Sequence, residues 1–206
     1  MFKAIKNDFA ENCYIIAEGK KAFVIDPGSN YNEMKAFLEH NRLTLEAVLL
    51  THGHYDHICG LNNLLETYDA PIYIHKVERD FLFDPNLNLS SFMSSRFKVK
   101  DKHRIHTFDE VMDFTLGDET IKVIHTPGHT RGSVSFHYKS MLFSGDCLFK
   151  ETIGRTDLPT GNQAVLIETV QSLYAQFDPN TVVYPGHGPF TTLAHEMHHN
   201  AFVKSA

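Results

Sequence analysis

The stretch that most constrains this chain is an apolar run at residues 47–50, followed by three histidines and an aspartate spaced H-x-H-x-D-H. Such a run is typical of a strand buried on both faces. His52 and His54 are two residues apart, so their side chains project to one side while the backbone stays extended. Asp56 and His57 follow after a turn and can face another point. One loop can therefore supply ligands to two neighbouring metal ions; a chance cluster of polar loop residues is the alternative.

Three later segments, at residues 124–130, 142–146 and 184–188, have a similar form: an apolar run, a turn with glycine, and a residue type that binds metals. Glycine permits turns denied to bulkier residues, and these can aim the next side chain back over the strand ends. We therefore predict that seven side chains converge: His52, His54, Asp56, His57, His129, Asp146 and His187. Seven ligands are too many for one tetrahedral ion but suit two ions with a shared carboxylate.

The bulk properties are those of an ordinary globular protein, with 206 residues, 42% of them hydrophobic and 21% charged. No repeat or linker is visible, so we predict one domain over residues 1–206. The net charge of −6 is spread along the chain, and we expect no nucleic-acid partner. No membrane-spanning stretch or leader is visible, and the three cysteines are unpatterned. We therefore expect a cytoplasmic protein without a membrane partner.

Local patterns predict alternating strands and helices. Strands are expected at 12–18, 21–26, 47–50, 71–75, 111–116, 120–126, 133–138, 141–145 and 181–184. Helices are expected at 31–42 with Ser29 or Asn30 as cap, around 61–65, at 163–177, and from Thr191 or Thr192 to about residue 202. The order strand–helix–strand–helix–strand in the first part of the chain indicates α/β units.

Residues 76–103 are the least regular part of the sequence. Residues 78–83 could be helical, whereas residues 84–100 are rich in Asn, Ser and Phe without a usable period, and we treat them as an irregular insertion. A long loop inside a compact domain is more often functional or mobile than idle. The insertion could be a lid over the site, an interface or a tolerated surface loop.

The motifs H-x-H-x-D-H, T-P-G-H-T-x-G-S, S-G-D-x-L-F, G-R-T-D and P-G-H-G occur in this order. Together they resemble the metallo-β-lactamase superfamily, and within it the glyoxalase II-like hydrolases. The resemblance covers residues 26–196 and implies an α/β fold, a four-layer αββα sandwich with the site at one edge between the sheets.

The resemblance also assigns roles to the candidate ligands. The first metal would be held by His52, His54 and His129, the second by Asp56, His57 and His187, with Asp146 as the bridge. Asp26, in the D-P-G turn, and Ser133 would support the ligands from behind. Each could instead have only a local role, Asp26 as the end of a strand and Ser133 as the start of one.

Two bound divalent ions suggest a hydrolytic mechanism. A shared water loses much of its proton affinity, with a pKa of about 7 instead of 15.7. The hypothesis is that this metal-bound hydroxide attacks an activated carbonyl while Asp56 orients it and accepts its proton. Imidazole and carboxylate ligands suit zinc, which we expect, but also iron or manganese. Many zinc β-lactamases would have a cysteine where Asp146 stands, which disfavours antibiotic hydrolysis.

Full-length glyoxalase II enzymes carry a further C-terminal helical region that binds glutathione, whereas only one short helix is expected after His187. The chain therefore resembles the short glyoxalase II-like group. We predict a thioester hydrolase acting on S-lactoylglutathione or a related hydroxyacyl thioester. Arg155, Lys150 and Arg131 are candidates for holding an anionic substrate tail, Arg155 foremost. An internal pair between Arg155 and Asp157 is the alternative.

Two other activities stay open. A persulfide dioxygenase with one Fe(II) would, by resemblance, use only His52, His129 and Asp146. Against it, Leu158-Pro159 follows G-R-T-D here, where that family tends to have Phe-Gln. The third possibility is a metallohydrolase of lactones, phosphoesters or other esters. The sequence does not predict the natural acyl group, the thiol carrier, the native metal or the oligomeric state.

Overall fold

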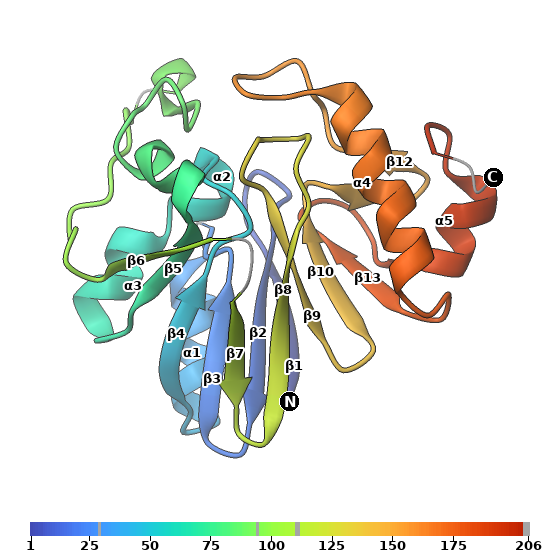
Figure 1. The fold of residues 1–206 in the computed structure, drawn as a ribbon. Coiled ribbons are helices and arrows are strands. Elements are labelled where there is room, and N and C mark those ends of the chain that lie inside the picture. The colour runs from blue at the N-terminus through green and yellow to red at the C-terminus, as the bar shows by residue number, and fades with distance from the viewer. Residues whose placement is uncertain (29, 94, 110–111, 204–206) are drawn as a thin grey trace.

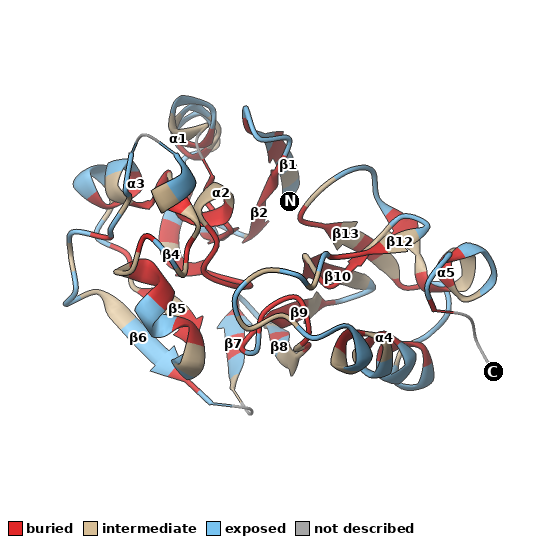
Figure 2. Cartoon of the chain, turned by 90° about the horizontal axis from the view of Figure 1, so that it is seen from above, coloured by how far each residue is buried: buried red, intermediate tan, exposed pale blue. Residues whose placement is uncertain are grey.

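Two six-stranded sheets, one from each half of the chain, pack face to face in the computed structural model (Figure 1). The structure describes residues 1–28, 30–93, 95–109 and 112–203. Helices cover the outer side of each sheet, which gives four layers in the order helix, sheet, sheet, helix (Figure 2). This is the αββα sandwich that the motifs predict.

The first sheet has the strand order β1-β2-β3-β4-β5-β6. Its strands are β1 (Phe2–Lys6), β2 (Asn12–Glu18), β3 (Lys21–Ile25), β4 (Thr44–Leu49), β5 (Ile72–His75) and β6 (Ile105–Phe108). The first three are antiparallel neighbours, whereas β3 to β6 run parallel. Parallel strands need crossover connections, and these contain α1 (Tyr31–His40), α2 (Tyr55–Ile58) and α3 (Leu61–Thr67).

The second sheet has the order β14-β13-β10-β9-β8-β7. Its strands are β7 (Asp113–Leu116), β8 (Glu119–His125), β9 (Val134–Tyr138), β10 (Met141–Gly145), β13 (Val182–Pro185) and β14 (Thr191–Thr192). Only β10 and β13 pair in parallel. A small hairpin of β11 (Leu148–Phe149) and β12 (Thr152–Ile153) lies between them in sequence, and α4 (Gln163–Gln176) and α5 (Leu193–His199) cover this sheet.

Three hydrophobic cores fill the spaces between the four layers. Strand β4 contributes to two of them, because its side chains alternate. Val48 packs in the core beneath α1 and α3, whereas Ala47 and Leu49 pack between the sheets. The third core joins Leu142 of β10 to Leu166 of α4. Burial of β4 on both faces, as predicted, explains its continuous apolar run.

Most predicted elements are confirmed, including the hairpin of β2 and β3 and the strands that precede the candidate ligands. Thr192 caps α5 as predicted, because its side chain accepts the N–H of His195. Asn30 stands at the N-cap of α1 without a side-chain hydrogen bond; Ser29 and residue 111 lie outside the described residues. The prediction omitted β1, β6, β14, α2 and the β11–β12 hairpin.

The irregular insertion at 84–100 folds back toward α2. Its described residues contain one 3₁₀ turn, η2 (Ser90–Phe92), and it follows a longer 3₁₀ segment, η1 (Lys76–Leu82). Asn88 is buried, and its side chain donates to the carbonyls of Phe81 and Phe97. Its own carbonyl accepts the N–H of Tyr55. The insertion is therefore anchored beside the candidate site.

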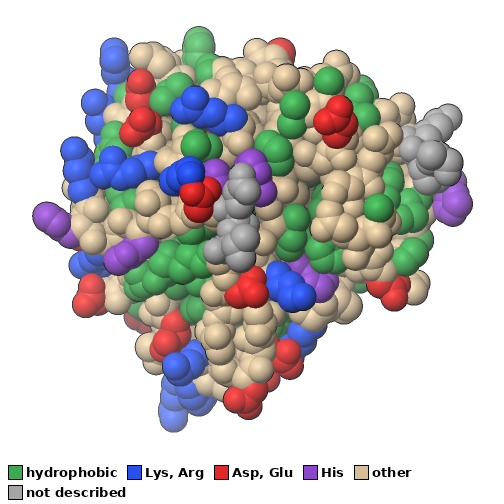
Figure 3. All heavy atoms as spheres, in the orientation of Figure 1, with side chains coloured by type: hydrophobic (Ala, Val, Ile, Leu, Met, Phe, Trp, Pro, Cys, Tyr) green, Lys and Arg blue, Asp and Glu red, His purple; other side chains and the backbone are tan. Residues whose placement is uncertain are grey.

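The surface carries both kinds of charge. On the face in Figure 3, acidic and basic side chains are interspersed, and hydrophobic side chains reach the surface between them. Within the described ranges, none of the helices combines the length and the apolar character needed to cross a lipid bilayer.

Candidate metal centre and active site

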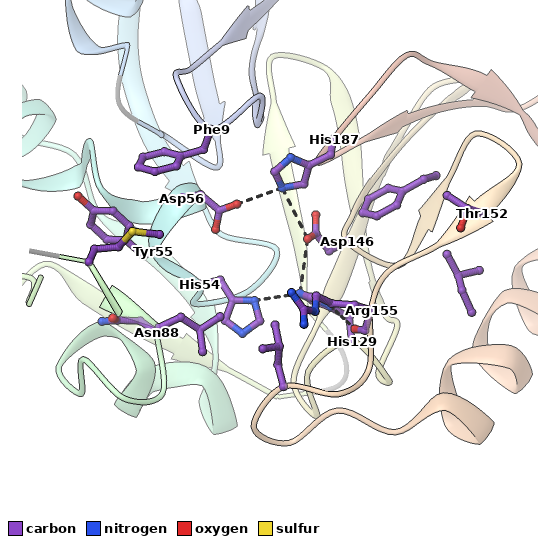
Figure 4. Close-up of a pocket in the computed structure, with 15 residues that line it drawn as sticks. Phe9, His54, Tyr55, Asp56, Asn88, His129, Asp146, Thr152, Arg155 and His187 are labelled. Carbon is purple, nitrogen blue, oxygen red and sulfur yellow. Dashed lines mark hydrogen bonds and ion pairs between the residues drawn. The ribbon is translucent and has the colours of Figure 1, made fainter. Parts of the chain in front are cut away.

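The seven predicted ligands lie together at the edge of the sandwich where strands of both sheets end. The loop after β4 carries His52 and His54, and α2 carries Asp56 and His57; the turns after β8, β10 and β13 carry His129, Asp146 and His187. Figure 4 shows five of these side chains pointing toward one another beside a cavity. The structure thus brings together all seven residues that the motifs singled out.

Backbone hydrogen bonds join the two sheets at this edge. The N–H of Val134 donates to the carbonyl of Thr51 at 2.9 Å.

Gly145 has φ +50°, and a Cβ there would lie 2.4 Å from the Thr51 hydroxyl oxygen. A Cβ on Gly186 would lie 2.3 Å from Oδ1 of Asp146. The turns after β10 and β13 therefore need glycine to bring their side chains into the centre.

Three histidines form the first ligand group. Nδ1 of His54 lies 3.1 Å from Nε2 of His52 and 2.9 Å from Nε2 of His129. All three rings are buried, and each can offer one nitrogen to the same ion. They match the first predicted metal position.

Asp56, His57 and His187 form the second group. Oδ2 of Asp56 lies 3.0 Å from Nε2 of His187 and 3.8 Å from Nε2 of His57. Asp146 lies between the groups: its Oδ1 is 3.3 Å from Nε2 of His57, and its Oδ2 is 3.5 Å from Nε2 of His129. A single carboxylate therefore reaches ligand atoms of both groups.

In two of the candidate ligands, a hydrogen bond from the ring nitrogen that faces away from the cluster determines which nitrogen carries a proton. Nδ1 of His129 donates to the Arg155 carbonyl at 2.7 Å, because a carbonyl can only accept, and Nε2 is the ring nitrogen that faces the cluster. Nδ1 of His57 donates to Oδ2 of Asp26 at 3.0 Å. Within the described chain, the buried atoms Nε2 of His57 and Oδ1 of Asp146 have no hydrogen-bond partner. A ring nitrogen and a carboxylate oxygen that converge here without partners fit a divalent cation.

Burial and neighbouring charges set the ionisation of these groups. Burial lowers the pKa of His54 to about 3, and burial together with the nearby His57 lowers the pKa of His52. Burial alone would raise the pKa of Asp146, but the adjacent His57 outweighs it and lowers the pKa of that carboxyl. At neutral pH, His52 and His54 are therefore neutral and Asp146 is ionised, the forms that bind metals.

Asp26 lies behind the ligands, in contact with His57. Its carboxylate also accepts the N–H of Thr51 at 2.7 Å and the Thr51 hydroxyl at 2.6 Å. The same hydroxyl oxygen lies 3.0 Å from Nδ1 of His52. Asp26 thus orients one ligand of the second group directly and one of the first group through Thr51.

Ser133 and Cys147 have local contacts. The hydroxyl of Ser133 bonds the hydroxyl of Thr130 at 2.7 Å and accepts its N–H at 3.2 Å. Ser133 thereby shapes the turn that carries His129. Cys147 packs in the core beneath α4, although it follows Asp146 in the sequence.

Of the three predicted cationic substrate contacts, one lines the cavity beside the ligand groups and the other two do not. Nε and Nη2 of Arg155 each lie 2.7 Å from a carboxylate oxygen of Asp157, which is the internal pair considered as the alternative. The Arg155 side chain lines the cavity, but Lys150 and Arg131 are exposed and are not among the described lining residues.

Glu78, a buried carboxylate that the sequence did not single out, joins the two loops of the first group. It accepts the N–H of Gly53 at 3.2 Å and the N–H of Gly132 at 3.0 Å. Gly53 lies between His52 and His54. Burial raises the pKa of Glu78 to about 7. No sequence signal marks this residue, because its partners are backbone groups 25 and 54 positions away.

The turn between β1 and β2 supports the second group in a similar way. The amide of Asn7 donates to the carbonyl of Asp56 at 3.0 Å and to the carboxylate of Glu11 at 2.9 Å. Glu11 is buried, and its other oxygen lies 4.0 Å from Nδ1 of His57. Burial raises the pKa of Glu11 well above its usual value.

Asn12, at the start of β2, holds the last ligand turn. Its side-chain amide donates to the carbonyls of Pro185 and Gly188, both at 2.9 Å. These two residues flank the short turn that contains His187. Its own N–H donates to the carbonyl of Gly186, so three bonds from one residue fix this turn.

A cavity of about 560 Å³ opens beside both ligand groups (Figure 4). Five candidate ligands line it: His54, Asp56, His129, Asp146 and His187. The remaining lining residues are Phe9, Tyr55, Asn88, Leu89, Met93, Phe149, Thr152, Ile153, Arg155 and Leu158.

The sequence profile of the Metallo-beta-lactamase superfamily matches residues 7–187, which include every candidate ligand. The chain belongs to the metallo-β-lactamase superfamily. This superfamily member is 31% identical to "Hydroxyacylglutathione hydrolase GloC" of Haemophilus influenzae, over 96% of the chain and 94% of that relative. The family assignment and the metal-binding cluster together make it a metallo-hydrolase.

Two solved structures share the fold of this metallo-β-lactamase superfamily protein. BLEG-1, described as a B3 metallo-β-lactamase, is 39% identical with a TM-score of 0.89, over 98% of this chain and 99% of that one. TTHA1623, solved in a di-iron-bound form, is 31% identical with a TM-score of 0.85, over 98% and 100%.

Proposed function

We propose that the protein is a thioester hydrolase with two divalent metal ions, most suitably zinc, acting on S-lactoylglutathione or a related hydroxyacyl thioester. The position of Asp146 between two complete ligand groups carries this proposal. His52, His54 and His129 would hold one ion and Asp56, His57 and His187 the other, with the Asp146 carboxylate within reach of both groups.

When bound, divalent cations supply Lewis-acid chemistry: they acidify water and polarise a carbonyl. Asp56 orients the attacking water and accepts its proton, because its side chain is 27% exposed to the cavity whereas that of Asp146 is 11% exposed. Asp26 and the Arg155 carbonyl keep His57 and His129 in the required ring orientation.

The GloC relative supports a hydroxyacyl thioester as substrate. The completeness of the second ligand group favours hydrolysis over a persulfide dioxygenase, which would need only His52, His129 and Asp146. The di-iron form of TTHA1623 keeps iron as an alternative metal. Metal analysis distinguishes the hydrolase from the dioxygenase: two zinc ions per chain support hydrolysis, whereas one iron ion per chain supports oxygen chemistry.

The test is steady-state hydrolysis of S-lactoylglutathione and of a neutral thioester by zinc-loaded protein, with metal-stripped protein as control. We expect metal-dependent turnover of at least one thioester, with kcat/KM of about 10⁴ M⁻¹s⁻¹ or more. Failure with both would move the proposal to lactones or other esters.

Asp146→Ala should abolish this turnover, because it removes the carboxylate that both ligand groups share. Circular dichroism should show that the variant keeps its secondary structure. Near-normal turnover by Asp146→Ala would contradict the two-metal proposal.

β-Lactam hydrolysis is a second candidate, supported by the 39% identity to BLEG-1. A chromogenic cephalosporin should be assayed beside the thioesters with the same metal-stripped control. A kcat/KM higher for the cephalosporin than for every thioester would replace the first proposal with this one.

A further inference from the structure

The cavity beside the ligand groups has two apolar walls. One set of apolar lining residues, which we call the first wall, comes from the half of the chain that forms the first sheet: Phe9, Tyr55, Leu89 and Met93; the other set, from the half that forms the second sheet, is Phe149, Ile153 and Leu158. Figure 4 shows Phe9 and Tyr55 on one side of the ligand cluster and Thr152 on the other.

Two residues of the first wall are unusually open to solvent. Phe9 is 39% exposed and Met93 is 44% exposed, whereas most large apolar side chains of this chain are buried. Phe9 packs edge-on against Tyr55, with ring centroids 5.6 Å apart. Covering an exposed apolar surface is favourable, and such surfaces in a cavity mark binding sites. This wall is therefore suited to an apolar part of the substrate.

The cavity offers little to an anionic substrate tail. Among the described lining residues, Arg155 is the one lysine or arginine, and Asp157 already binds its guanidinium with two hydrogen bonds of 2.7 Å. The pair is exposed and opens at small cost. A substrate carboxylate would nevertheless have to replace Asp157 as the partner of Arg155. Because the two carboxylates are similar, the exchange would add little to the binding free energy.

We propose that the preferred substrate is a thioester whose acyl group is apolar and that Phe9, Tyr55 and Met93 bind this group. The inference rests on the proposed thioester hydrolase activity and replaces the hydroxyacyl group of that proposal with an apolar one. In the reaction, water adds to the acyl carbon, the C–S bond breaks, and the departing sulfur takes up a proton. The products are a carboxylic acid and a free thiol. Acyl length, rather than the charge of the thiol, then sets specificity.

The first experiment measures kcat/KM of the zinc-loaded enzyme for acetyl, butyryl and hexanoyl thioesters of the neutral thiol N-acetylcysteamine. We expect kcat/KM to rise with length, by up to about fourfold for each methylene group. Phe9→Ser and Met93→Ser should flatten this dependence. Phe202→Ser is the matched control, because Phe202 is 50% exposed but does not line the cavity; its dependence should equal that of wild type.

The second experiment joins the same acyl group to glutathione and to N-acetylcysteamine and compares wild type with Arg155→Ala. We expect the ratio of the two kcat/KM values to be the same in both proteins. A selective loss with the glutathione thioester would show that Arg155 binds an anionic tail and would overturn the inference.

Turnover without dependence on acyl length, or a preference for lactoyl over hexanoyl on the same thiol, would overturn the acyl inference alone. Absence of turnover with every thioester would overturn the proposed activity and, with it, this inference. The two failures are therefore distinguishable.

Discussion

Glu78 joins the loops of the first ligand group through the N–H groups of Gly53 and Gly132. Replacing it with leucine leaves both donors buried and unpaired. We expect Glu78→Leu to lower the free energy of unfolding by about 2–5 kcal/mol, measured by urea denaturation of metal-free protein. Glu66→Leu, at an exposed position of α3, is the control and should change stability by less than about 0.5 kcal/mol. Equal effects would contradict the role of Glu78.

Glu78 should also affect the pH dependence of stability. Its pKa is about 7 in the folded protein because of burial, against 4.5 for an ordinary glutamate. The folded state therefore binds an extra proton between these values, so the contribution of Glu78 to stability falls as pH rises from about 4.5 to 7. We expect the unfolding free energy of metal-free Glu78→Gln to fall less steeply over this range than that of wild type. Parallel curves would contradict the expected titration.

The convergence of the seven candidate ligands could be predicted because each is a metal-binding residue type soon after an apolar run, and their order matches a family pattern. Glu78 and Asn7 could not be predicted, because they act on backbone groups that are distant in sequence. Arg155 was predicted as a substrate contact, but its neighbour Asp157 already binds it. Local sequence shows which charged residues are present but not which partner each one takes.

At the scale of elements, the start of β2 determines the position of one ligand turn. Asn12→Ala removes the two hydrogen bonds that the side-chain amide donates to the carbonyls of Pro185 and Gly188 and that hold the turn with His187. We expect metal affinity at the second group to fall about 10- to 100-fold. After dialysis against a weak chelator, zinc per chain should fall from two ions toward one.

Asn180→Ala is the control for Asn12→Ala, because among the described residues the side chain of Asn180 donates a hydrogen bond only to its neighbour Asp178. Its zinc content should equal that of wild type after the same dialysis. Loss of both ions together from Asn12→Ala would show that the turn does not act on the second group selectively.

The elements that the sequence did not predict share a weak apolar signal. β1 and β6 are edge strands, and each has only one buried residue, Ile5 in β1 and Phe108 in β6. β11, β12 and β14 have two residues each, and α2 is a single turn of four residues, too short to show a helical period. Their places are fixed by neighbouring strands and by the site. By contrast, strands buried on a full face or on both faces were predictable.

At the scale of the whole molecule, the metal centre joins the two halves, because His57 comes from the first half and Asp146 from the second. Metal binding should therefore stabilise the entire fold, by about 4 kcal/mol when the free metal is a thousandfold above its Kd. We expect zinc to raise Tm by roughly 8–16 °C in differential scanning calorimetry and a chelator to reverse this. Zinc should raise the Tm of Asp146→Ala much less than that of wild type. An equal rise in both proteins would contradict metal binding at this centre.

The division of the two sheets between the halves of the chain also sets an order of events during synthesis. Every strand of the first sheet has been made once residue 108 is added, whereas His129, Asp146 and His187 come later. At ordinary translation rates of about 5–20 residues per second, synthesis from residue 109 to His187 takes roughly 4 to 16 s. Until His129 is added, the growing polypeptide carries only the four candidate ligands of the first half: His52, His54, Asp56 and His57. Capture of the ions is then among the last steps of its maturation, and it signals that the two sheets have docked.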